Sequence, residues 1–245
     1  MNIIKLNAID STNSYLKELA QKSTLENFTA VVANQQTLGR GQLGTTWEAE
    51  QGKSLTFSLL LNFNRFRIQD QFYLSMAVSL GLISALRPYL GMSLNIKWPN
   101  DILAEKDKLA GILIENVLKG TNIHHSIIGI GLNVNQLEFP TDIGNVTSLK
   151  KLTGTNFNLD ELLFKVVDSI QKYVDYLEKE DFQSLKKIYL AQLYKINTPS
   201  MFEDANGLIF LGKICTVDEN GRLVIELENE KTRKFNLKEI KFASR

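Results

Sequence analysis

The feature that most constrains the fold of this 245-residue chain is a run of strand-like segments between residues 94 and 134. Four apolar stretches with strand propensity follow one another with only short turns between them, over residues 94–98, 102–104, 109–118 and 125–134. Strands joined by short turns pair antiparallel, because a parallel pair needs a long crossover connection. The sequence therefore predicts an α+β fold with a mixed, mainly antiparallel central sheet.

Helical periodicity is found on both sides of this strand run. Apolar residues recur with helical spacing in three regions, residues 12–22, 69–87 and 159–193. Ser11 or Thr12 can cap the first helix, Pro88 closes the second, and a break near Asp181 is expected in the third. Two further strands are expected over residues 28–34 and 55–63, so that helices flank the central sheet.

The pattern changes near the segment Asn197–Pro199. Downstream of it the periodic segments are all strand-like, over residues 208–217, 222–227 and 232–237. Asn220-Gly221 between the first two is a strong signal for a hairpin turn. About 45 residues of short strands form only a small barrel with marginal stability of its own. We therefore expect two domains, residues 1–196 and residues 197–245.

Composition excludes several classes of protein. A net charge of +1 provides no basic field for nucleic acid. The single cysteine, Cys215, cannot form an internal disulfide, which favours a reducing cytoplasm. The N-terminus lacks a signal-peptide pattern, and no apolar run approaches the roughly 18 residues that would span a membrane. His124 and His125 are adjacent on a strand and point to opposite faces, so we expect no metal ligands in the protein.

The five residues Lys97–Asp101 place a cation, an indole, a proline, an amide and a carboxylate side by side. In a buried strand each polar group would need a partner, because an unpaired buried charge or amide costs several kcal/mol. The segment is therefore either a surface turn or the floor of a polar pocket. Three other segments favour the pocket.

The first of them, residues 36–47, carries three glycines within six positions, with Arg40 between two of them. Glycines let main-chain N–H groups approach a ligand closely, and successive N–H groups can form a concavity for an anion. Arg40 adds a planar set of donors suited to phosphate or carboxylate. A flexible hairpin with an incidental Arg is the alternative, and the missing Lys-Ser or Lys-Thr pair excludes a P-loop.

The other two segments are strand-like runs with small residues. In residues 108–115 a lysine precedes an Ala-Gly pair, and small residues at the start of a strand suggest that something lies against the backbone there. In residues 129–135 two glycines alternate with apolar residues, but a third glycine and a following helix are missing, so this is no dinucleotide fingerprint. We expect these glycines to clear room for a ligand, with Asn133 offering an amide.

Taken together, these motifs closely resemble those of the biotin–protein ligases. The resemblance rests on the order and spacing of Ser11-Thr12-Asn13, residues 36–47, Lys97–Asp101, Lys108–Gly111 and Gly129–Asn133. Residues 197–245 are similar to the small C-terminal domain of that family. The resemblance implies a catalytic domain like the class II aminoacyl-tRNA synthetases, followed by an SH3-like β-barrel.

The resemblance also implies a reaction. Biotin and ATP, with Mg²⁺, form biotinyl-5′-AMP and pyrophosphate, and biotin is then transferred to a lysine of a biotin carboxyl carrier protein. A carboxylate and a polyphosphate repel each other, so fixed cations must offset the charge that develops on the phosphate oxygens. Arg40, Lys97 and Lys108 are expected to converge where biotin meets the nucleotide. Asp101 is expected to orient Arg40 or Lys97, and the alternative is that it helps to deprotonate the incoming lysine.

Two sets of ligand contacts follow from the resemblance. Biotin is expected to contact Ser11, Thr12, Asn13, Gln36, Gly39, Arg40, Gly41, Lys97, Gly111 and Ile112. ATP or the adenylate is expected to contact Arg40, Gln42, Trp47, Lys97, Asn100, Lys108 and Asn133. We expect Trp47 to cover the nucleotide, although it could instead pack under the loop.

The Gly-rich loop departs from the family pattern. Many relatives carry arginines at the positions that Gln42, Leu43 and Thr45 occupy here. The loss of three cations predicts that this enzyme retains biotinyl-AMP less tightly than its more basic relatives.

Several alternatives remain at this point. Lipoate–protein ligases and octanoyl transferases share the fold, and a biotin- or nucleotide-binding sensor would need no catalysis. Some relatives carry an N-terminal DNA-binding domain, but Ser11 already belongs to the catalytic core, so we expect no operator binding. An exposed edge of the central sheet could pair two subunits in a homodimer.

Overall fold

The structure is a computed structural model that describes residues 1–91, 94–141 and 144–243. The larger part of the molecule is built on a seven-stranded sheet. Its order is β1 (Ile3–Ile9), β2 (Ala30–Gln36), β3 (Ser54–Arg67), β7 (Asn122–Asn133), β6 (Asp107–Lys119), β5 (Asp101–Ala104) and β4 (Leu94–Lys97). Only β1 and β2 pair parallel, and the other neighbours pair antiparallel. The predicted α+β class with a mainly antiparallel sheet is thus confirmed.

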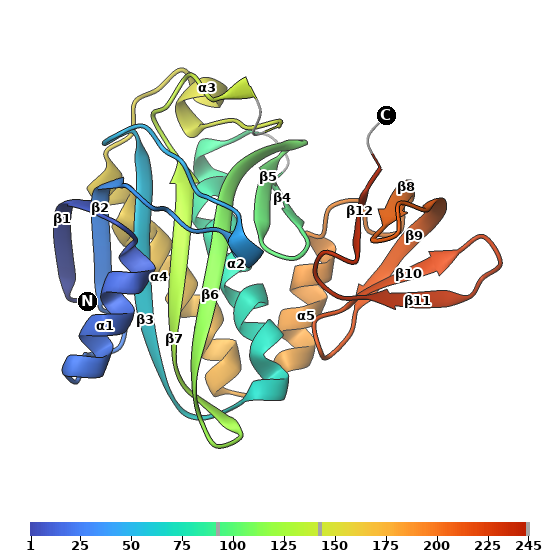
Figure 1. Ribbon diagram of the computed structural model, residues 1–245, viewed down its shortest axis with the longest axis horizontal. Coiled ribbons are helices and arrows are strands. Elements are labelled where there is room, and N and C mark those ends of the chain that lie inside the picture. The colour runs from blue at the N-terminus through green and yellow to red at the C-terminus, as the bar shows by residue number, and fades with distance from the viewer. Residues whose placement is uncertain (92–93, 142–143, 244–245) are drawn as a thin grey trace.

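Helices cover both faces of this sheet (Figure 1). One face carries α2 (Gln71–Leu86), α4 (Leu159–Glu178) and α5 (Phe182–Ala191), and the other carries α1 (Thr12–Lys22) over β2, β3 and β7. Burial on both faces explains why residues 54–61 of β3 are buried without alternation. Gly81 lets α2 approach α4 closely, because a Cβ there would overlap the backbone of Ile170.

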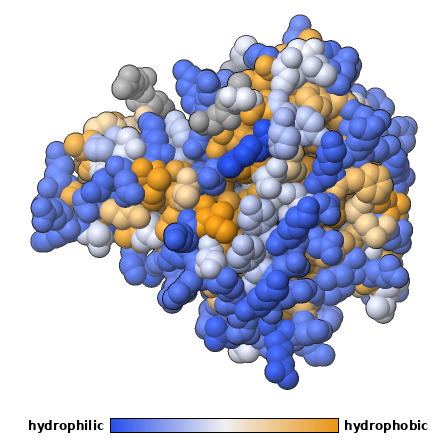
Figure 2. Space-filling model, turned by 180° about the vertical axis from the view of Figure 1, so that it is seen from behind, coloured by the Kyte–Doolittle hydropathy of each residue, from blue (hydrophilic) through white to orange (hydrophobic). Residues whose placement is uncertain are grey.

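Short elements complete this part. They are the helix α3 (Leu149–Thr153) and the 3-10 turns η1 (Gln42–Gly44), η2 (Ile68–Asp70) and η3 (Arg87–Tyr89). Seen from behind, the surface is mainly hydrophilic, with hydrophobic residues gathered on and beside the C-terminal part (Figure 2). Within the described residues, no helix is both long and apolar enough to cross a membrane.

The C-terminal part is a five-stranded antiparallel sheet. Its order is β11 (Thr232–Phe235), β10 (Leu223–Leu227), β9 (Ile209–Val217), β8 (Pro199–Asp204) and β12 (Ile240–Phe242). The predicted hairpin is confirmed, since Gly221 has a φ of +80° in the turn between β9 and β10. The Asp218 carboxylate fixes this turn by accepting from the backbone N–H groups of Asn220 and Arg222.

The two sheets are joined by main-chain and side-chain hydrogen bonds. The connecting segment pairs with both of them: Tyr194 N donates to Ile96 O in β4, and Asn197 N donates to Ile214 O in β9. Trp98 adds a side-chain link, because its Nε1 donates to Gly221 O at 2.9 Å. The segment Lys97–Asp101 is therefore fastened directly to the β9–β10 turn.

Most predicted elements are present, with shifted ends. The helix capped by Ser11 and the break at Asp181, which caps α5, are confirmed. The strand expected to begin at residue 28 begins at Ala30, because Phe28 has a φ of +61°, which no strand accommodates. Three strands were missed: β1, whose side chains are all partly or fully exposed, β8, which begins at Pro199 directly after the expected domain boundary, and β12, which has only three residues.

Candidate active site

A cavity of about 860 Å³ lies between the large sheet and the C-terminal sheet. All but two of the residues predicted to bind ligand line it: Ser11, Thr12, Asn13, Gln36, Arg40, Gly41, Gln42, Trp47, Lys97, Asn100, Asp101, Lys108, Gly111 and Ile112. Gly39 and Asn133 are not part of its wall, and Asn133 is only 2% exposed at the end of β7. Segments as distant in sequence as residues 11 and 112 are thus brought to one site.

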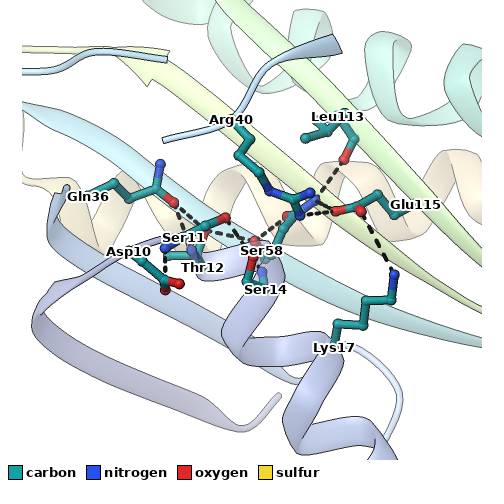
Figure 3. A network of polar contacts seen from close by, with 11 residues as sticks. Asp10, Ser11, Thr12, Ser14, Lys17, Gln36, Arg40, Ser58, Leu113 and Glu115 are labelled. Atoms are coloured by element: carbon teal, nitrogen blue, oxygen red, sulfur yellow. Dashed lines mark hydrogen bonds and ion pairs between the residues drawn. The ribbon is translucent and has the colours of Figure 1, made fainter. Parts of the chain in front are cut away.

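One end of the cavity is a continuous hydrogen-bond network at the start of α1 (Figure 3). Gln36 Oε1 accepts from both Thr12 N and Thr12 Oγ1, at 2.8 and 3.0 Å. Ser58 Oγ lies 2.8 Å from Thr12 Oγ1 and 2.5 Å from Asn13 Oδ1. Because these side chains are held before any ligand binds, this end presents donors and acceptors in fixed directions.

Arg40 also lies at this end. Its Nη2 donates to Glu115 Oε2 at 2.6 Å, and Asn13 Nδ2 donates to the same oxygen at 2.9 Å. Lys17 Nζ is 4.0 Å from the other carboxylate oxygen of Glu115. We expected Arg40 to converge with Lys97 and Lys108, whereas in the structure it pairs with Glu115, an acidic residue that was not among the candidates.

The other end of the cavity carries Lys97, Asp101 and Lys108. Asp101 was expected to pair with Arg40 or Lys97, but its Oδ1 is 2.8 Å from Lys108 Nζ. This contact is an ion pair without hydrogen-bond geometry, since Asp101 Oδ1 accepts no hydrogen bond within the described residues. The side chain of Lys97 has no hydrogen bond or ion pair in the same part of the chain. The separation of the two ends can be followed along β6. Lys108 Nζ lies against Gly111, and Gly111 is four strand residues, or about 13 Å, from Glu115 at the other end.

The turn between β4 and β5 is held in place by hydrogen bonds to β6. Asn100 Nδ2 donates to Ile112 O at 2.9 Å, and Ile112 N donates to Asn100 O at 3.0 Å. This double contact ties the predicted Lys97–Asp101 motif to β6. Asn100 lines the cavity, but its amide nitrogen is engaged in fixing the turn.

Trp47 lies flat against the floor of the cavity. A Cβ at Gly131 would overlap its ring, and a Cβ at Gly111 would be 3.2 Å from it. Lys108 Nζ is 5.7 Å from the ring centroid. The Nε1 atom of Trp47 is buried with no partner in the described residues, so one donor of this side chain is left unsatisfied.

The glycines of β7 therefore make room for protein side chains. Gly131 accommodates Trp47, and Gly129 accommodates Asn13, whose Oδ1 would overlap a Cβ at that position. We expected both glycines to clear room for a ligand. Both do line the cavity, and in addition they set the positions of two side chains in its wall, Asn13 and Trp47.

The Gly-rich loop uses its N–H groups internally. Gly41 N donates to Thr45 O, Thr45 N donates to Gln42 O, and Trp47 N donates to Gly39 O. These groups are consequently not free to form the anion concavity that the glycine pattern predicts. Gly39 is required because a Cβ there would overlap the carbonyl of Trp47.

No group of three or more His, Cys, Asp or Glu residues that could hold a metal ion occurs in the described part of the chain. His124 is exposed and His125 is buried, in agreement with their expected opposite directions on the strand. Burial lowers the pKa of His125, and the neighbouring His124 and Lys17 lower it further.

Comparison with known proteins identifies the family. Residues 6–133 match the model of the biotin/lipoate A/B protein ligase family. The bifunctional ligase/repressor BirA of Bacillus spizizenii is 30% identical over 231 residues, which cover 93% of this chain and 70% of that protein. The chain belongs to the biotin/lipoate A/B protein ligase family. The prediction made from its motifs is confirmed at this level.

Further relatives match over most of their length. The biotin–[acetyl-CoA-carboxylase] ligase of Paracoccus denitrificans is 28% identical over 229 residues, covering 88% of this chain and 90% of the relative. The biotin protein ligase of Aquifex aeolicus, solved in complex with biotin and ATP, has a TM-score of 0.80 at 29% identity, over 99% of both chains. This member of the family thus shares the whole architecture, including the C-terminal sheet.

Three contributors to the site of this family member were missed. Ser58 and Glu115 were hidden because a single polar residue in or after an apolar run gives no indication of its cross-strand neighbours. The third is a cavity wall from the C-terminal sheet, formed by residues 202–207, Ile214, Leu223, Leu237, Lys238 and residues 240–242. The strand pattern reveals which residues of that sheet are apolar but not which face meets the larger sheet.

Proposed function

We propose that this chain is a biotin–protein ligase. It activates biotin with ATP to biotinyl-5′-AMP and transfers biotin to a lysine of a biotin carboxyl carrier protein. The observation that carries the proposal is a single cavity whose wall combines the Ser11–Asn13 network with the Lys97–Asp101 turn and Lys108. Relatives named as biotin ligases, and a related structure that holds biotin and ATP, support this substrate pair.

The proposed orientation puts the ureido ring of biotin at the network end. The ring presents one acceptor and two donors, and Ser11, Thr12, Asn13 and Gln36 offer complementary groups within one cluster. The apolar tail would run along β6 past Gly111 and Ile112, beside the ring of Trp47. This direction brings the carboxylate toward Lys97 and Lys108.

In the first step a carboxylate oxygen of biotin attacks the α-phosphorus of ATP. A new P–O bond forms, the bond to the β-phosphate breaks, and pyrophosphate leaves. Lys97 and Lys108 would offset the negative charge on the phosphorus oxygens, and a donor of this kind is worth roughly 2.7–4 kcal/mol in other enzymes. Asp101 holds Lys108 in place, so we assign it an orienting role.

In the second step the amine of the acceptor lysine attacks the acyl carbon of biotinyl-5′-AMP. An amide forms, AMP leaves, and the amine loses a proton. Asp101 Oδ1 is already engaged with Lys108 Nζ, so we do not assign Asp101 the role of base for that proton. Asn100 keeps its structural role, and Trp47 would pack against the adenylate from the floor of the cavity.

The side chains of the cavity do not form a dedicated magnesium site in the described residues. Mg²⁺ would therefore enter bound to the phosphates of ATP, as part of the substrate, which suits its preference for retaining water ligands. We further propose that residues 1–196 and 197–245 are separate domains, that the protein works in the cytoplasm, and that β1, an edge of the large sheet, can pair with a second subunit.

The test is biotin-dependent exchange of labelled pyrophosphate into ATP, with lipoate offered in parallel. We expect exchange with biotin and none with lipoate, because the family includes lipoate ligases but the Lys97–Asp101 motif is that of the biotin ligases. Mass spectrometry of a carrier domain incubated with biotin, ATP and Mg²⁺ should then reveal one added biotin. Exchange with lipoate alone would assign the chain to the other branch, and no exchange would leave only a binding protein.

A further inference from the structure

Glu115 stands behind the cavity wall and contacts two residues that form it. It does not line the cavity itself. Its Oε2 accepts from Arg40 Nη2 at 2.6 Å and from Asn13 Nδ2 at 2.9 Å, and Lys17 lies beside its other oxygen (Figure 3). One carboxylate thus joins the start of α1 to the Gly-rich loop through β6.

We propose that Glu115 is a positioning residue for biotin: it orients the Asn13 amide and fastens the Gly-rich loop to the sheet through Arg40. This inference rests on the proposed function, because the ligand is biotin. It assigns to the Arg40 side chain an anchoring role at the ureido end, in place of the expected contact with the adenylate.

The orientation of Asn13 follows from the acceptors around it. A carboxylate can only accept hydrogen bonds, and Leu113 O, 3.3 Å from Nδ2, is a second acceptor. The Asn13 NH₂ group must therefore face Glu115, which turns Oδ1 toward Ser58 and leaves the Ser58 hydroxyl to donate to it. Ser58 Oγ is then the donor to Asn13 Oδ1 and Thr12 Oγ1, while Thr12 Oγ1 gives its own proton to Gln36 Oε1. The Asn13 orientation set by Glu115 is therefore consistent with the whole network.

The loop depends on the same carboxylate. The ion pair from Arg40 to Glu115 is the one charge pair that ties residues 40–47 to the sheet in the part of the chain described by the structure. The other polar contacts of Gly41, Thr45 and Trp47 remain within the loop. Without Glu115, the loop and Trp47 would lose their charged attachment over the biotin site.

The solvent exposure of Arg40 and Glu115 determines which measurement should detect the loss of their ion pair. The side chains of Arg40 and Glu115 are 43% and 22% exposed, so solvent screens the pair and little of the global stability depends on it. The positioning role therefore predicts a change in biotin affinity at nearly unchanged melting temperature. A merely structural role would lower the melting temperature instead.

The experiment is calorimetric titration of biotin into the full-length Glu115→Gln variant, without ATP. Gln has nearly the same shape but no charge: its amide oxygen can still face Asn13 and Arg40, but the ion pair with Arg40 is lost and the NH₂ group is turned toward the Lys17 ammonium. We expect the Kd for biotin to rise about tenfold, while pyrophosphate exchange at saturating biotin and ATP changes less than threefold. Glu226→Gln is the matched control, because it breaks a 2.7 Å ion pair with Lys213 outside the cavity wall and should leave the Kd within twofold.

Two further variants make the test independent of one substitution. Glu115→Asp keeps the charge but shortens the reach, so its Kd should exceed that of the wild type, and this variant carries the test if Glu115→Gln does not fold. If both fold, the Kd of Glu115→Asp should be the smaller of the two. In an Arg40→Gln background the effect of Glu115→Gln should shrink, because one of its two partners is already gone.

An unchanged or lower Kd in both Glu115 variants would overturn the inference, as would equal effects with and without Arg40. These outcomes are separate from a failure of the proposed function, in which the wild-type chain would neither bind biotin nor catalyse biotin-dependent exchange.

Discussion

The two ends of the cavity differ in how their polar groups are satisfied before a ligand arrives. At the α1 end, Thr12, Asn13, Gln36 and Ser58 bond to one another in a closed network. At the β4–β5 end, the Lys97 side chain has no hydrogen bond or ion pair in the described residues, and the Lys108 ammonium has one ion pair there, with Asp101, beside the Trp47 ring. One end is complete without ligand, and the other has excess positive charge.

This difference matches the two chemical tasks that we propose. A neutral ureido ring gains affinity from groups that are already oriented, because binding then does not have to supply the free energy of ordering those side chains. A carboxylate and a triphosphate bring their own negative charge, so cations that remain unpaired can be neutralised by the ligands themselves. We expect substitutions at the first end to change binding and substitutions at the second end to change the rate.

The largest effect is expected at the β4–β5 end of the cavity, where we expect substitutions to change the rate. Lys97→Met should lower kcat for biotin-dependent pyrophosphate exchange by roughly 10²–10³-fold, the usual result of removing one preorganised donor. Its melting temperature should stay unchanged, because no ion pair is lost. Lys106→Met, on the exposed turn between β5 and β6, is the control and should have wild-type activity. A kcat within threefold of wild type in Lys97→Met would remove the distinction between the two ends.

The next effect is expected at the binding end. Ser58→Ala should raise the Kd for biotin about tenfold and lower stability by about 1–3 kcal/mol, because Asn13 Oδ1 loses its donor in a buried position. Calorimetry and chemical denaturation measure the two quantities. Ser79→Ala provides a matched control, since this buried hydroxyl on α2 has no partner to lose. Equal results for the two serine variants would contradict the importance of the network.

A smaller effect is expected where the C-terminal sheet meets the catalytic turn. Trp98→Phe removes the hydrogen bond to Gly221 O and should cost about 0.5–1.5 kcal/mol of stability. The KM for ATP should rise a few-fold while the KM for biotin stays constant, because the wall from the C-terminal sheet lies on the nucleotide side. Steady-state exchange assays with each substrate varied would detect this split. A matching rise in both KM values would show that the turn supports the whole cavity.

The smallest effect concerns the loop that lacks basic residues. Gln42→Arg adds a cation to the cavity wall and should slow dissociation of labelled biotinyl-AMP about two- to tenfold, as expected for a partly solvated charge. An unchanged or faster dissociation rate would count against the view that this loop limits retention of the adenylate.

The sequence was most informative where motifs are contiguous. The segment Lys97–Asp101 was recognised as a pocket floor, and the structure has it as the turn between β4 and β5 beside Lys108. The cap at Ser11 and the turn at Gly221 were found for the same reason, since capping and turn chemistry are local.

What the sequence could not provide is the pairing of residues across strands and between the two sheets. Arg40 is 75 positions from Glu115, and their contact depends on how the loop folds over β6. Asn133 looked suited to a ligand because it ends a glycine-rich strand, but the register with Ser54 of β3 buries it. A sequence pattern shows which residue types are present. It does not show which acidic side chain lies beside each cation in the folded protein, and therefore not which cation is already neutralised.

The most direct test of this division of the cavity is a crystal structure of the protein with biotinyl-5′-AMP. We predict the ureido ring against Thr12 and Asn13, Arg40 still on Glu115, and the amino groups of Lys97 and Lys108 about 3 Å from oxygens of the acyl-phosphate junction. A complex with the ureido ring beside Lys97, or with both lysines far from the phosphate, would contradict the account.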